Sequence, residues 1–467
     1  MTAQIDFETL WYASEWLIRF GALATVPLRR SPSAATSWLL LIFFFPALGL
    51  LLYLFIGRPR VPVARQKRAR ELRTFQLDVA RRLKNDSCGD RSEAADFAQK
   101  LGRMPCVDGN SIELISDYDA VVERLLADIR SAKYAVDLLV YIFADDVVGK
   151  RIAAELGEAV QRGVRCRVMF DPIGSHRWRR GTLSLLRDAG VETREALPVH
   201  LILRRTRADM RNHRKLFVID GLIGYAGSQN LVAKDFRPGV VNRELVARMS
   251  GPVVASLAST ISSDWAMEAL DRPDPFPVAI PAGSGELRAQ LLPSGADYPF
   301  EGFETLLVWQ LHRARQRAVL VTPYFIPDES IIGAMCSAAS RGVMIDLVVS
   351  SVVDQRIVHL AQCSYFEQLL AAGIRIHLYR ELLLHAKNAS IDRDLGIVGS
   401  SNVDFRSFQL NEEASLLLYD RSIIDRLIEI QDGYILASDS LALDSWRSRP
   451  RLQQLSENIA RIMSPLL

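Results

Sequence analysis

The pattern of apolar and polar positions changes along the chain, and from about residue 109 onward it alternates between two periods. Short, nearly continuous apolar runs such as AVDLLVYIF (135–143) and VRCRVMFD (164–171) are typical of buried strands. The segment GKRIAAELGEAVQRG (149–163) between them repeats its apolar residues at helical spacing. Strands that alternate with helices in this way predict an α/β fold.

The N-terminal part follows a different pattern. No charged residue occurs from Ser31 to Gly57. At about 1.5 Å per residue the apolar part of this run covers a bilayer core of roughly 30 Å, so the pattern predicts one transmembrane helix over residues 37–56. Segment 7–28 is also apolar but contains Glu15 and Arg19. It is either a weaker first span, with these two side chains paired, or a helix lying at the membrane interface.

A basic cluster follows the apolar run. A cleaved signal peptide has a shorter apolar region followed by small residues, whereas this run ends in GRPRVPVARQKRAR (57–70). We therefore expect the anchor to be retained. By the positive-inside rule, the basic cluster predicts that the rest of the chain lies on the cytoplasmic side.

The alternating region contains an internal duplication. The matching stretches are AVDLLVYIFADD (135–146) with AVLVTPYFIPDES (318–330), RGV (162–164) with RGV (341–343), and RDAGVET (187–193) with LAAGIRI (370–376). They lie 179 to 183 positions apart. Two copies of one α/β layer are expected to pack about a pseudo-twofold axis.

These patterns divide the chain into six predicted segments. A Pro-rich stretch interrupts the alternating pattern and is typical of an interdomain linker. The segments are a membrane anchor (1–73), a helical connector (74–108), a first half (109–270), the linker (271–285), a second half (286–437) and a C-terminal helical tail (438–467).

A second repeated feature carries titratable side chains. Each half contains His-x-Lys, four residues, Asp, six residues and Gly-Ser-x-Asn; the positions are His213, Lys215, Asp220, Ser228 and Asn230, and His385, Lys387, Asp392, Ser400 and Asn402. On a strand, residues i and i+2 share a face, so each histidine projects together with its lysine. One copy alone is also typical of a strand start with a solvated lysine, but two copies with matching tails favour a functional site.

These side chains suit cleavage of a phosphodiester without a metal. A neutral imidazole can attack phosphorus and form a phosphohistidine, and a second, protonated imidazole can donate its proton to the leaving alkoxide. Lysine and asparagine side chains are donors for the phosphoryl oxygens. A twofold axis between the halves would bring both motifs to one cleft, although they lie about 170 residues apart in the sequence.

Composition narrows the function classes. The 467 residues include 57 basic and 54 acidic side chains, and a net charge of +3 argues against a dedicated nucleic-acid binder. The five cysteines are scattered without CxxC spacing, which argues against a disulfide framework and against a zinc ribbon. The other histidines show no metal-ligand spacing, so we expect no metal site and no cofactor.

The paired motifs resemble the HKD motifs of the phospholipase D superfamily, and the surrounding sequence looks most like bacterial cardiolipin synthases. The supporting stretches are RRSPSAATSWLLLIFFFPALGLLLYLFIGR (29–58), PSGADYP (293–299), TPYFIPDES (322–330), LLHAKNASID (383–392) and VGSSNVDFRSFQLNEE (398–413). The resemblance implies two phospholipase D-like α/β/α halves related by a pseudo-twofold axis and preceded by the membrane anchor. It also implies a place in the bacterial inner membrane.

The resemblance assigns roles to individual residues. It implies that His213 is the nucleophile and His385 the general acid/base, and that the phosphate is held by Lys215, Lys387, Asn230, Asn402, Ser228 and Ser400. In the family an acidic residue some thirty positions after each histidine orients the imidazole, and the residues at those places are Glu244 and Glu413. The motif also includes Asp220 and Asp392 in the catalytic set, although an aspartate at the end of an apolar strand commonly serves turn chemistry.

The activity implied by the resemblance is a phosphatidyl transfer that joins two phosphatidylglycerol molecules into cardiolipin and glycerol through a phosphohistidine. Hydrolysis of the phospholipase D type and other phosphatidyl transfers, such as phosphatidylserine synthesis, would use the same motifs. A catalytically silent membrane scaffold is the contrasting class, and the intact pair of motifs argues against it. The expected partners are a phospholipid and the membrane, without nucleic acid.

Overall fold

One large sheet forms the centre of the molecule. The computed structural model describes residues 7–30, 32–55, 57, 63–85, 92–198, 209–269, 275–298 and 302–463. From the centre of the sheet outward, the strands of the first half are β1 (Val107–Ile115), β9 (Val246–Ser250), β7 (Ile223–Gly227), β6 (Leu216–Ile219), β2 (Ala135–Val140), β3 (Arg165–Phe170) and β4 (Glu192–Glu195).

The second half repeats this order in the other direction. Its strands, again from the centre outward, are β10 (Leu287–Ser294), β19 (Asn411–Leu418), β17 (Leu395–Gly399), β16 (Asn388–Ile391), β11 (Arg317–Val321), β13 (Met344–Ser350), β14 (Arg375–Tyr379) and β20 (Ser438–Ser440). The halves meet where β1 and β10 pair antiparallel, with Val107 opposite Ala289. This matching order confirms the duplication that the sequence predicts.

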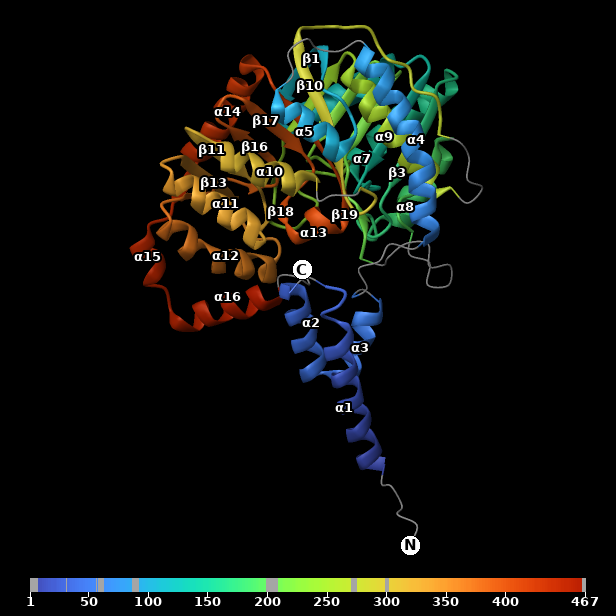
Figure 1. Ribbon diagram of the computed structural model, residues 1–467. Coiled ribbons are helices and arrows are strands. Elements are labelled where there is room, and N and C mark those ends of the chain that lie inside the picture. The colour runs from blue at the N-terminus through green and yellow to red at the C-terminus, as the bar shows by residue number, and fades with distance from the viewer. Residues whose placement is uncertain are drawn as a thin grey trace.

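Helices cover the sheet in both halves (Figure 1). They are α6 (Tyr118–Ser131), α7 (Val147–Gln161) and α8 (Arg179–Asp188) in the first half, and α10 (Gly302–Arg313), α11 (Glu329–Ser340) and α12 (Arg356–Ala371) in the second. Their apolar residues enclose a separate core in each half, around residues such as Leu125 and Ile152 or Leu307 and Phe366. The mixed α/β fold predicted from the sequence is confirmed.

A third core joins the two halves. It lies under α4 (Val63–Asn85), α9 (Val253–Glu268) and α14 (Arg421–Leu436), and it includes Val79, Leu257 and Ile424. Because both halves contribute to this core and to the sheet, they are held as one body. Helix α5 (Glu93–Gly102) begins at Ser92, whose side chain accepts a hydrogen bond from the backbone N–H of Ala95, and leads into β1.

The N-terminal apolar segment differs from the single transmembrane helix predicted over residues 37–56. It forms two short helices, α2 (Pro32–Phe44) and α3 (Pro46–Phe55), because Pro46 cannot continue a helix but is well suited to begin one. The two helices fold against each other, with the rings of Trp38 and Tyr53 5.3 Å apart. Gly49 permits this approach, since a Cβ there would lie 2.7 Å from the Cα of Ile42. Within the described ranges, no helix has the length and apolar character needed to cross a membrane.

Helix α1 (Phe7–Thr25) completes a small three-helix group with α2 and α3, which projects from one end of the body (Figure 1). Glu15 and Arg19 form an ion pair, with an N–O distance of 3.2 Å, as one of the two alternatives for this segment expects. The outer surface of the group is apolar, and Phe7, Leu17 and Phe44 are each at least 73% exposed.

The C-terminal segment, predicted as a helical tail, begins instead with a strand. β20 pairs antiparallel with β14 and closes that edge of the sheet. Helices α15 (Leu443–Arg447) and α16 (Arg451–Met463) follow, and α16 packs along α12.

Candidate active site

Two short strand pairs bring the repeated motifs together across the boundary between the halves. β5 (Arg211–Asn212) pairs with the start of β19, and β15 (Leu383–Leu384) pairs with β8 (Asn242–Arg243). In this way the backbone N–H of His213 donates to the carbonyl of Glu412, and that of His385 donates to the carbonyl of Arg243, both at 2.8 Å. The segment before each histidine is therefore held by the other half.

Each histidine is oriented by the glutamate of the other half. Nδ1 of His213 lies 2.9 Å from a carboxylate oxygen of Glu413, and Nδ1 of His385 lies 2.7 Å from one of Glu244. The spacing in the sequence suggests that each glutamate serves the histidine of its own half, whereas the structure crosses the pairs. With Nδ1 engaged, Nε2 of each ring remains for a substrate.

A cavity of about 530 Å³ lies between the halves, and both histidines line it. Asn230 and Asn402 line it as well. The backbone N–H of Ile142 donates to Oδ1 of Asn230 at 3.0 Å, which leaves the amide N–H groups of Asn230 as donors for a ligand. The volume is in the range of small-molecule sites, so the cavity has room for a lipid headgroup and its phosphate.

The motif lysines are buried beside the histidines and are not among the residues that line the cavity. Nζ of Lys215 donates to the carbonyl oxygen of His213 at 2.7 Å, and Nζ of Lys387 donates to that of His385 at 2.6 Å. Burial lowers the pKa of Lys215 to about 7 and the pKa of Lys387 to about 8. Both ammonium groups have lost hydration, and an anion in the cavity would favour their charged forms.

The two histidine–glutamate pairs differ in their pKa shifts. Burial lowers the pKa of His213 to about 4 and lowers that of His385 well below its usual range. Burial raises the pKa of Glu244 to about 7. Burial also acts to raise the pKa of Glu413, but His213 and Lys215 outweigh it and hold this pKa below its ordinary value. Of the two glutamates, Glu413 therefore has the greater tendency to be ionised.

The motif serines bond to the glutamate strands and do not line the cavity. Oγ of Ser228 accepts from the backbone N–H of Leu245 at 3.0 Å, next to Glu244. Oγ of Ser400 accepts from the backbone N–H of Ala414 at 3.0 Å and donates to Glu413. Both serines thus bond to the strands or segments that carry the orienting glutamates, and the phosphate-binding role that the resemblance implies stays a prediction.

The motif aspartates lie outside the cavity. The carboxylate of Asp220 accepts hydrogen bonds from the backbone N–H groups of residues 133–135, and Asp392 does the same for residues 315–317. Both aspartates adopt a positive φ, of 52° and 50°. They fix the start of β2 and β11, which is the turn chemistry that the sequence also allowed.

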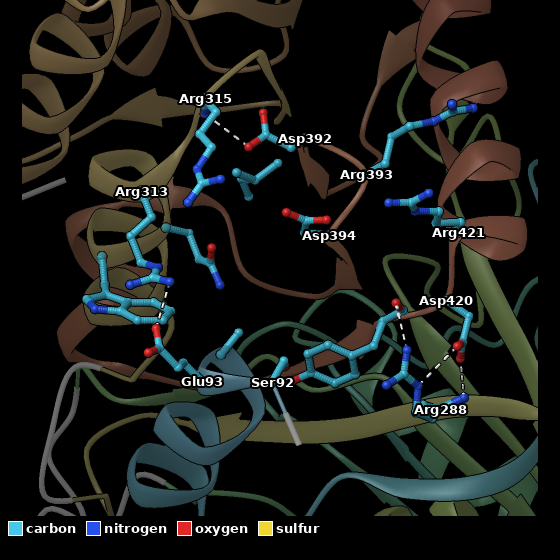
Figure 2. A pocket seen from close by; sticks show the side chains of 15 residues that line it. Ser92, Glu93, Arg288, Arg313, Arg315, Asp392, Arg393, Asp394, Asp420 and Arg421 are labelled. Carbon is cyan, nitrogen blue, oxygen red and sulfur yellow. Dashed lines mark hydrogen bonds and ion pairs between the residues drawn. The ribbon is translucent and has the colours of Figure 1, made fainter. Parts of the chain in front are cut away.

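Asp392 faces a second cavity, shown in Figure 2. This cavity of about 690 Å³ contains neither motif histidine, and its charged lining residues are Glu93, Arg288, Arg313, Arg315, Asp392, Arg393, Asp394, Asp420 and Arg421. Several of these charges pair with one another, such as Arg313 with Glu93 and Arg288 with Asp420.

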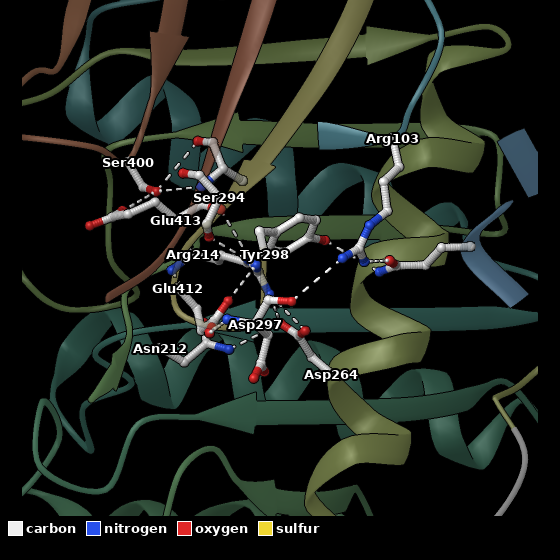
Figure 3. A network of polar contacts seen from close by, with 12 residues as sticks. Arg103, Asn212, Arg214, Asp264, Ser294, Asp297, Tyr298, Ser400, Glu412 and Glu413 are labelled. Atoms are coloured by element: carbon white, nitrogen blue, oxygen red, sulfur yellow. Dashed lines mark hydrogen bonds and ion pairs between the residues drawn. The ribbon is translucent and has the colours of Figure 1, made fainter. Parts of the chain in front are cut away.

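A buried network of charges supports the first motif (Figure 3). Arg214, whose side chain is 1% exposed, donates to both carboxylate oxygens of Asp264 at 2.6 and 2.7 Å and to Glu412 at 2.8 Å. Its Nε also donates to the carbonyl oxygen of Glu413 at 3.0 Å. Arg65 of α4 extends the network, because it pairs with Asp297, whose backbone N–H donates to Glu412. The network fixes the strand that carries the partner of His213.

Sequence reasoning missed several residues that line the cavity. Tyr141 and Tyr324 contact the histidines, with ring centroids 4.9 Å from His213 and 6.4 Å from His385. Arg237 and Arg406 also line the cavity. The available signal was a repeated Asp-Phe-Arg after each motif, at residues 235–237 and 404–406.

The two arginines have different surroundings. Arg237 pairs with Asp354, which also accepts a hydrogen bond from the hydroxyl of Tyr324 at 2.6 Å. Arg406 donates to the carbonyl oxygen of Asp209 at 2.9 Å. Among all the residues that the structure describes, no group of three or more His, Cys, Asp or Glu side chains is arranged to hold a metal ion.

Two halves with one histidine motif each, meeting at one cavity, define a phospholipase D-like protein. The family model for the cardiolipin synthase, PLD-like domain matches residues 125–265 and 307–433, and the model for the phospholipase D-nuclease N-terminal region matches residues 17–58. Cardiolipin synthase A of Pectobacterium carotovorum is 33% identical, over 98% of this chain and 100% of its own. Cardiolipin synthase A of Salmonella arizonae is 32% identical with the same coverage. The chain therefore belongs to the cardiolipin synthase family.

Solved structures agree on the fold. Phosphatidylserine synthase of Haemophilus influenzae superposes with a TM-score of 0.63 at 13% identity, over 81% of this chain and 100% of its own. A polyphosphate kinase of Porphyromonas gingivalis superposes with a TM-score of 0.50 at 14% identity, over 82% of this chain and 57% of its own. At these identities the likeness concerns the fold alone.

Proposed function

We propose that the chain transfers a phosphatidyl group from one phosphatidylglycerol molecule to another, which gives cardiolipin and glycerol. The observation that carries the proposal is the pair of imidazoles that line one cavity, each oriented through Nδ1 by a glutamate of the other half. The relatives named cardiolipin synthase A match over 98% of the chain, which supports this choice of substrate.

In the first step, Nε2 of His213 attacks the phosphorus of the donor lipid, and the bond from phosphorus to the glycerol oxygen breaks. His385, in its protonated form, gives its Nε2 proton to that oxygen, and glycerol leaves. In the second step, neutral His385 takes a proton from a hydroxyl of the second phosphatidylglycerol. The resulting alkoxide attacks phosphorus, and the phosphorus–nitrogen bond breaks.

The charges around the cavity suit a substrate that is an anion. Both histidine pKa values lie below the ordinary range, so the imidazoles are neutral at pH 7 in the free protein. A phosphodiester brings a negative charge, which raises the pKa of His385 and of both lysines when it binds. The same charge is then shared among Lys215, Lys387 and the two asparagine amides, which remain as donors in the transition state.

The choice between transfer and hydrolysis depends on which hydroxyl reaches the phosphohistidine. A lipid alcohol competes with water only when it is held at high effective concentration. We place α1–α3, with their exposed apolar surface, in the bilayer, and the catalytic body on the cytoplasmic side, as the basic segment 57–70 predicts. This position keeps the cavity at a surface rich in phosphatidylglycerol.

The test uses purified full-length protein in phosphatidylglycerol vesicles. We expect cardiolipin and glycerol as the main products and phosphatidic acid as a minor one. Because one phosphodiester replaces another, transfer is nearly isoergic, so excess glycerol should suppress cardiolipin. Phosphatidic acid as the main product at every glycerol concentration would instead identify a phospholipase.

A further inference from the structure

The last helix carries an apolar stripe that no other described part of the protein covers. Leu452, Leu455, Ile459 and Ile462 of α16 are 78%, 56%, 56% and 47% exposed. At 100° per residue, these four positions fall within an arc of about 80°. Single exposed apolar residues are common on protein surfaces, but four in one helical stripe indicate a binding face.

The opposite side of α16 is fixed to the catalytic body. Ala460 belongs to the core of the second half, and Glu457, 1% exposed, forms an ion pair with Arg449 at 2.6 Å. The guanidinium of Arg461 lies 4.7 Å from the ring centroid of Tyr365 on α12. Because the helix is held through this side, its apolar stripe has a fixed direction relative to the cavity.

The stripe lies at the end of the body from which α1–α3 project. In Figure 1, the C-terminal end of α16 lies beside the upper end of α2, and the hydroxyl of Ser37 on α2 donates to the carbonyl oxygen of Ile462 at 2.8 Å. The C-terminal end of α16 therefore lies beside the N-terminal helices, which have exposed apolar side chains of their own. The exposed charged residues of α16 are Arg451 and Arg461, both basic.

We propose that α16 is an interfacial helix that lies in the plane of the membrane, with its apolar stripe among the acyl chains and Arg451, next to the stripe, at anionic headgroups. An amphipathic helix with one apolar face and a basic polar face has the composition that such binding requires. A second copy of the chain would also bury the stripe, but the apolar surface of α1–α3 beside it and the basic charge of α16 favour lipid. The inference rests on the proposed function only in that the substrate is a membrane lipid.

Together with α1–α3, the helix would set how the cavity meets the bilayer. The N-terminal helices alone leave the body free to rotate about one attachment. A second attachment on the second half, which carries His385, removes that freedom and presents the cavity to lipid in one orientation. Loss of the stripe should therefore reduce use of bilayer substrate more than use of a dissolved one.

The test places the full-length protein in vesicles of phosphatidylglycerol and phosphatidylcholine that contain a phospholipid with a photoreactive acyl chain. After irradiation, peptide mapping locates the attached lipid. We expect label on the stripe of α16 as well as on α1–α3. The double variant Leu455→Ser/Ile459→Ser should lose the α16 label and retain the label on α1–α3.

Activity provides the second measurement. In vesicles, the double variant should form cardiolipin roughly three- to tenfold more slowly, since two apolar side chains no longer enter the membrane. Turnover of dissolved short-chain phosphatidylglycerol should stay unchanged. The control is Asn458→Ser on the same helix, which changes an exposed polar residue outside the stripe and should match the wild type in both assays.

The outcomes separate the two proposals. Wild-type label on α1–α3 but not on α16, with normal cardiolipin synthesis, would overturn the interfacial helix and leave the proposed function intact. A concentration-dependent dimer that the double variant abolishes, with α16 unlabelled, would identify a second copy as the occupant. Label on α16 without any cardiolipin would overturn the proposed function alone.

Discussion

The two halves of the protein have matching strand orders, but the surroundings support the histidine motif of each half in different ways. Behind His213, the middle residue of the motif is Arg214, which is buried between Asp264 and Glu412. Behind His385, the corresponding residue is Ala386, which packs in the apolar core between the halves. The middle residue of the first motif therefore joins a network of buried charges, and that of the second motif makes apolar contacts.

The difference extends to the orienting glutamates. The pKa of Glu413 is held below its ordinary value, whereas burial raises that of Glu244 to about 7. Environments that push apart the pKa values of two similar groups are typical of sites in which those groups have different roles. The comparison shows that the pseudo-twofold axis repeats the scaffold without repeating the electrostatics, which suits a nucleophile on one side and a general acid/base on the other.

The largest expected effect comes from the histidines themselves. His213→Ala and His385→Asn should each lower turnover about 10⁴-fold or more, because each removes a group that reacts with or protonates the substrate. Rapid-quench experiments with radioactive lipid should show no covalent label on His213→Ala and label that decays slowly on His385→Asn. Label retained by His213→Ala but lost in His385→Asn would exchange the two roles.

The next effect concerns the charged network of the first half. Arg214→Met leaves the carboxylates of Asp264 and Glu412 buried without their partner, so the free energy of unfolding should fall by about 3–5 kcal/mol. Urea unfolding in detergent measures it. Arg124→Gln is the control, because this arginine pairs with Glu113 at the surface, where a pair contributes about 0–1 kcal/mol. Equal losses in both variants would show that the network does not support the first motif.

The glutamates should give opposite pH effects on stability. The pKa of Glu244 in the folded protein, about 7, lies above its value in the unfolded chain, so the folded state binds more protons between about pH 4.5 and 7, and the wild type loses stability as pH rises through that range. Relative to the wild type, Glu244→Gln should therefore gain about 2–3 kcal/mol between pH 5 and pH 8.

Glu413 has a lowered pKa, so its contribution is fully present above the unfolded value and is lost only as pH falls below it. Glu413→Gln should thus be less stable than the wild type by a constant amount from pH 5 to pH 8. Unfolding curves at four pH values distinguish the two cases. If the free energy of unfolding of both variants changed with pH as that of the wild type does, the two histidine–glutamate pairs would be electrostatically alike.

The smallest effect should be the same in both halves. Asp220→Asn and Asp392→Asn each weaken a carboxylate that accepts three backbone hydrogen bonds, so each should lower stability by about 1–3 kcal/mol. Both variants should keep the rate of the chemical step, because neither carboxylate lines the cavity. A loss of turnover without loss of stability in either variant would place that aspartate in the reaction.

The sequence by itself determined the features that depend on local periodicity and on repetition. Alternating apolar runs predicted strands and helices, and the repeated stretches predicted two like halves about a pseudo-twofold axis, because a repeated pattern folds into the same unit twice. It also identified His213 and His385 as a pair, which the structure brings to one cavity. The break of the apolar segment was not predicted, because the apolar pattern indicated one helix over residues 37–56, although Pro46 lies within it.

Only the tertiary structure decided which groups meet. Glu413 reaches His213 and Glu244 reaches His385 because β19 pairs with β5 and β8 pairs with β15 across the boundary of the halves. Residue spacing in the sequence cannot predict these pairs, since a contact across a pseudo-twofold axis joins residues about 140 to 200 positions apart. The role of Arg214, between His213 and Lys215, is likewise apparent only in the folded protein, where this segment packs against Asp264 and Glu412 and burial makes the pairing of its charge necessary.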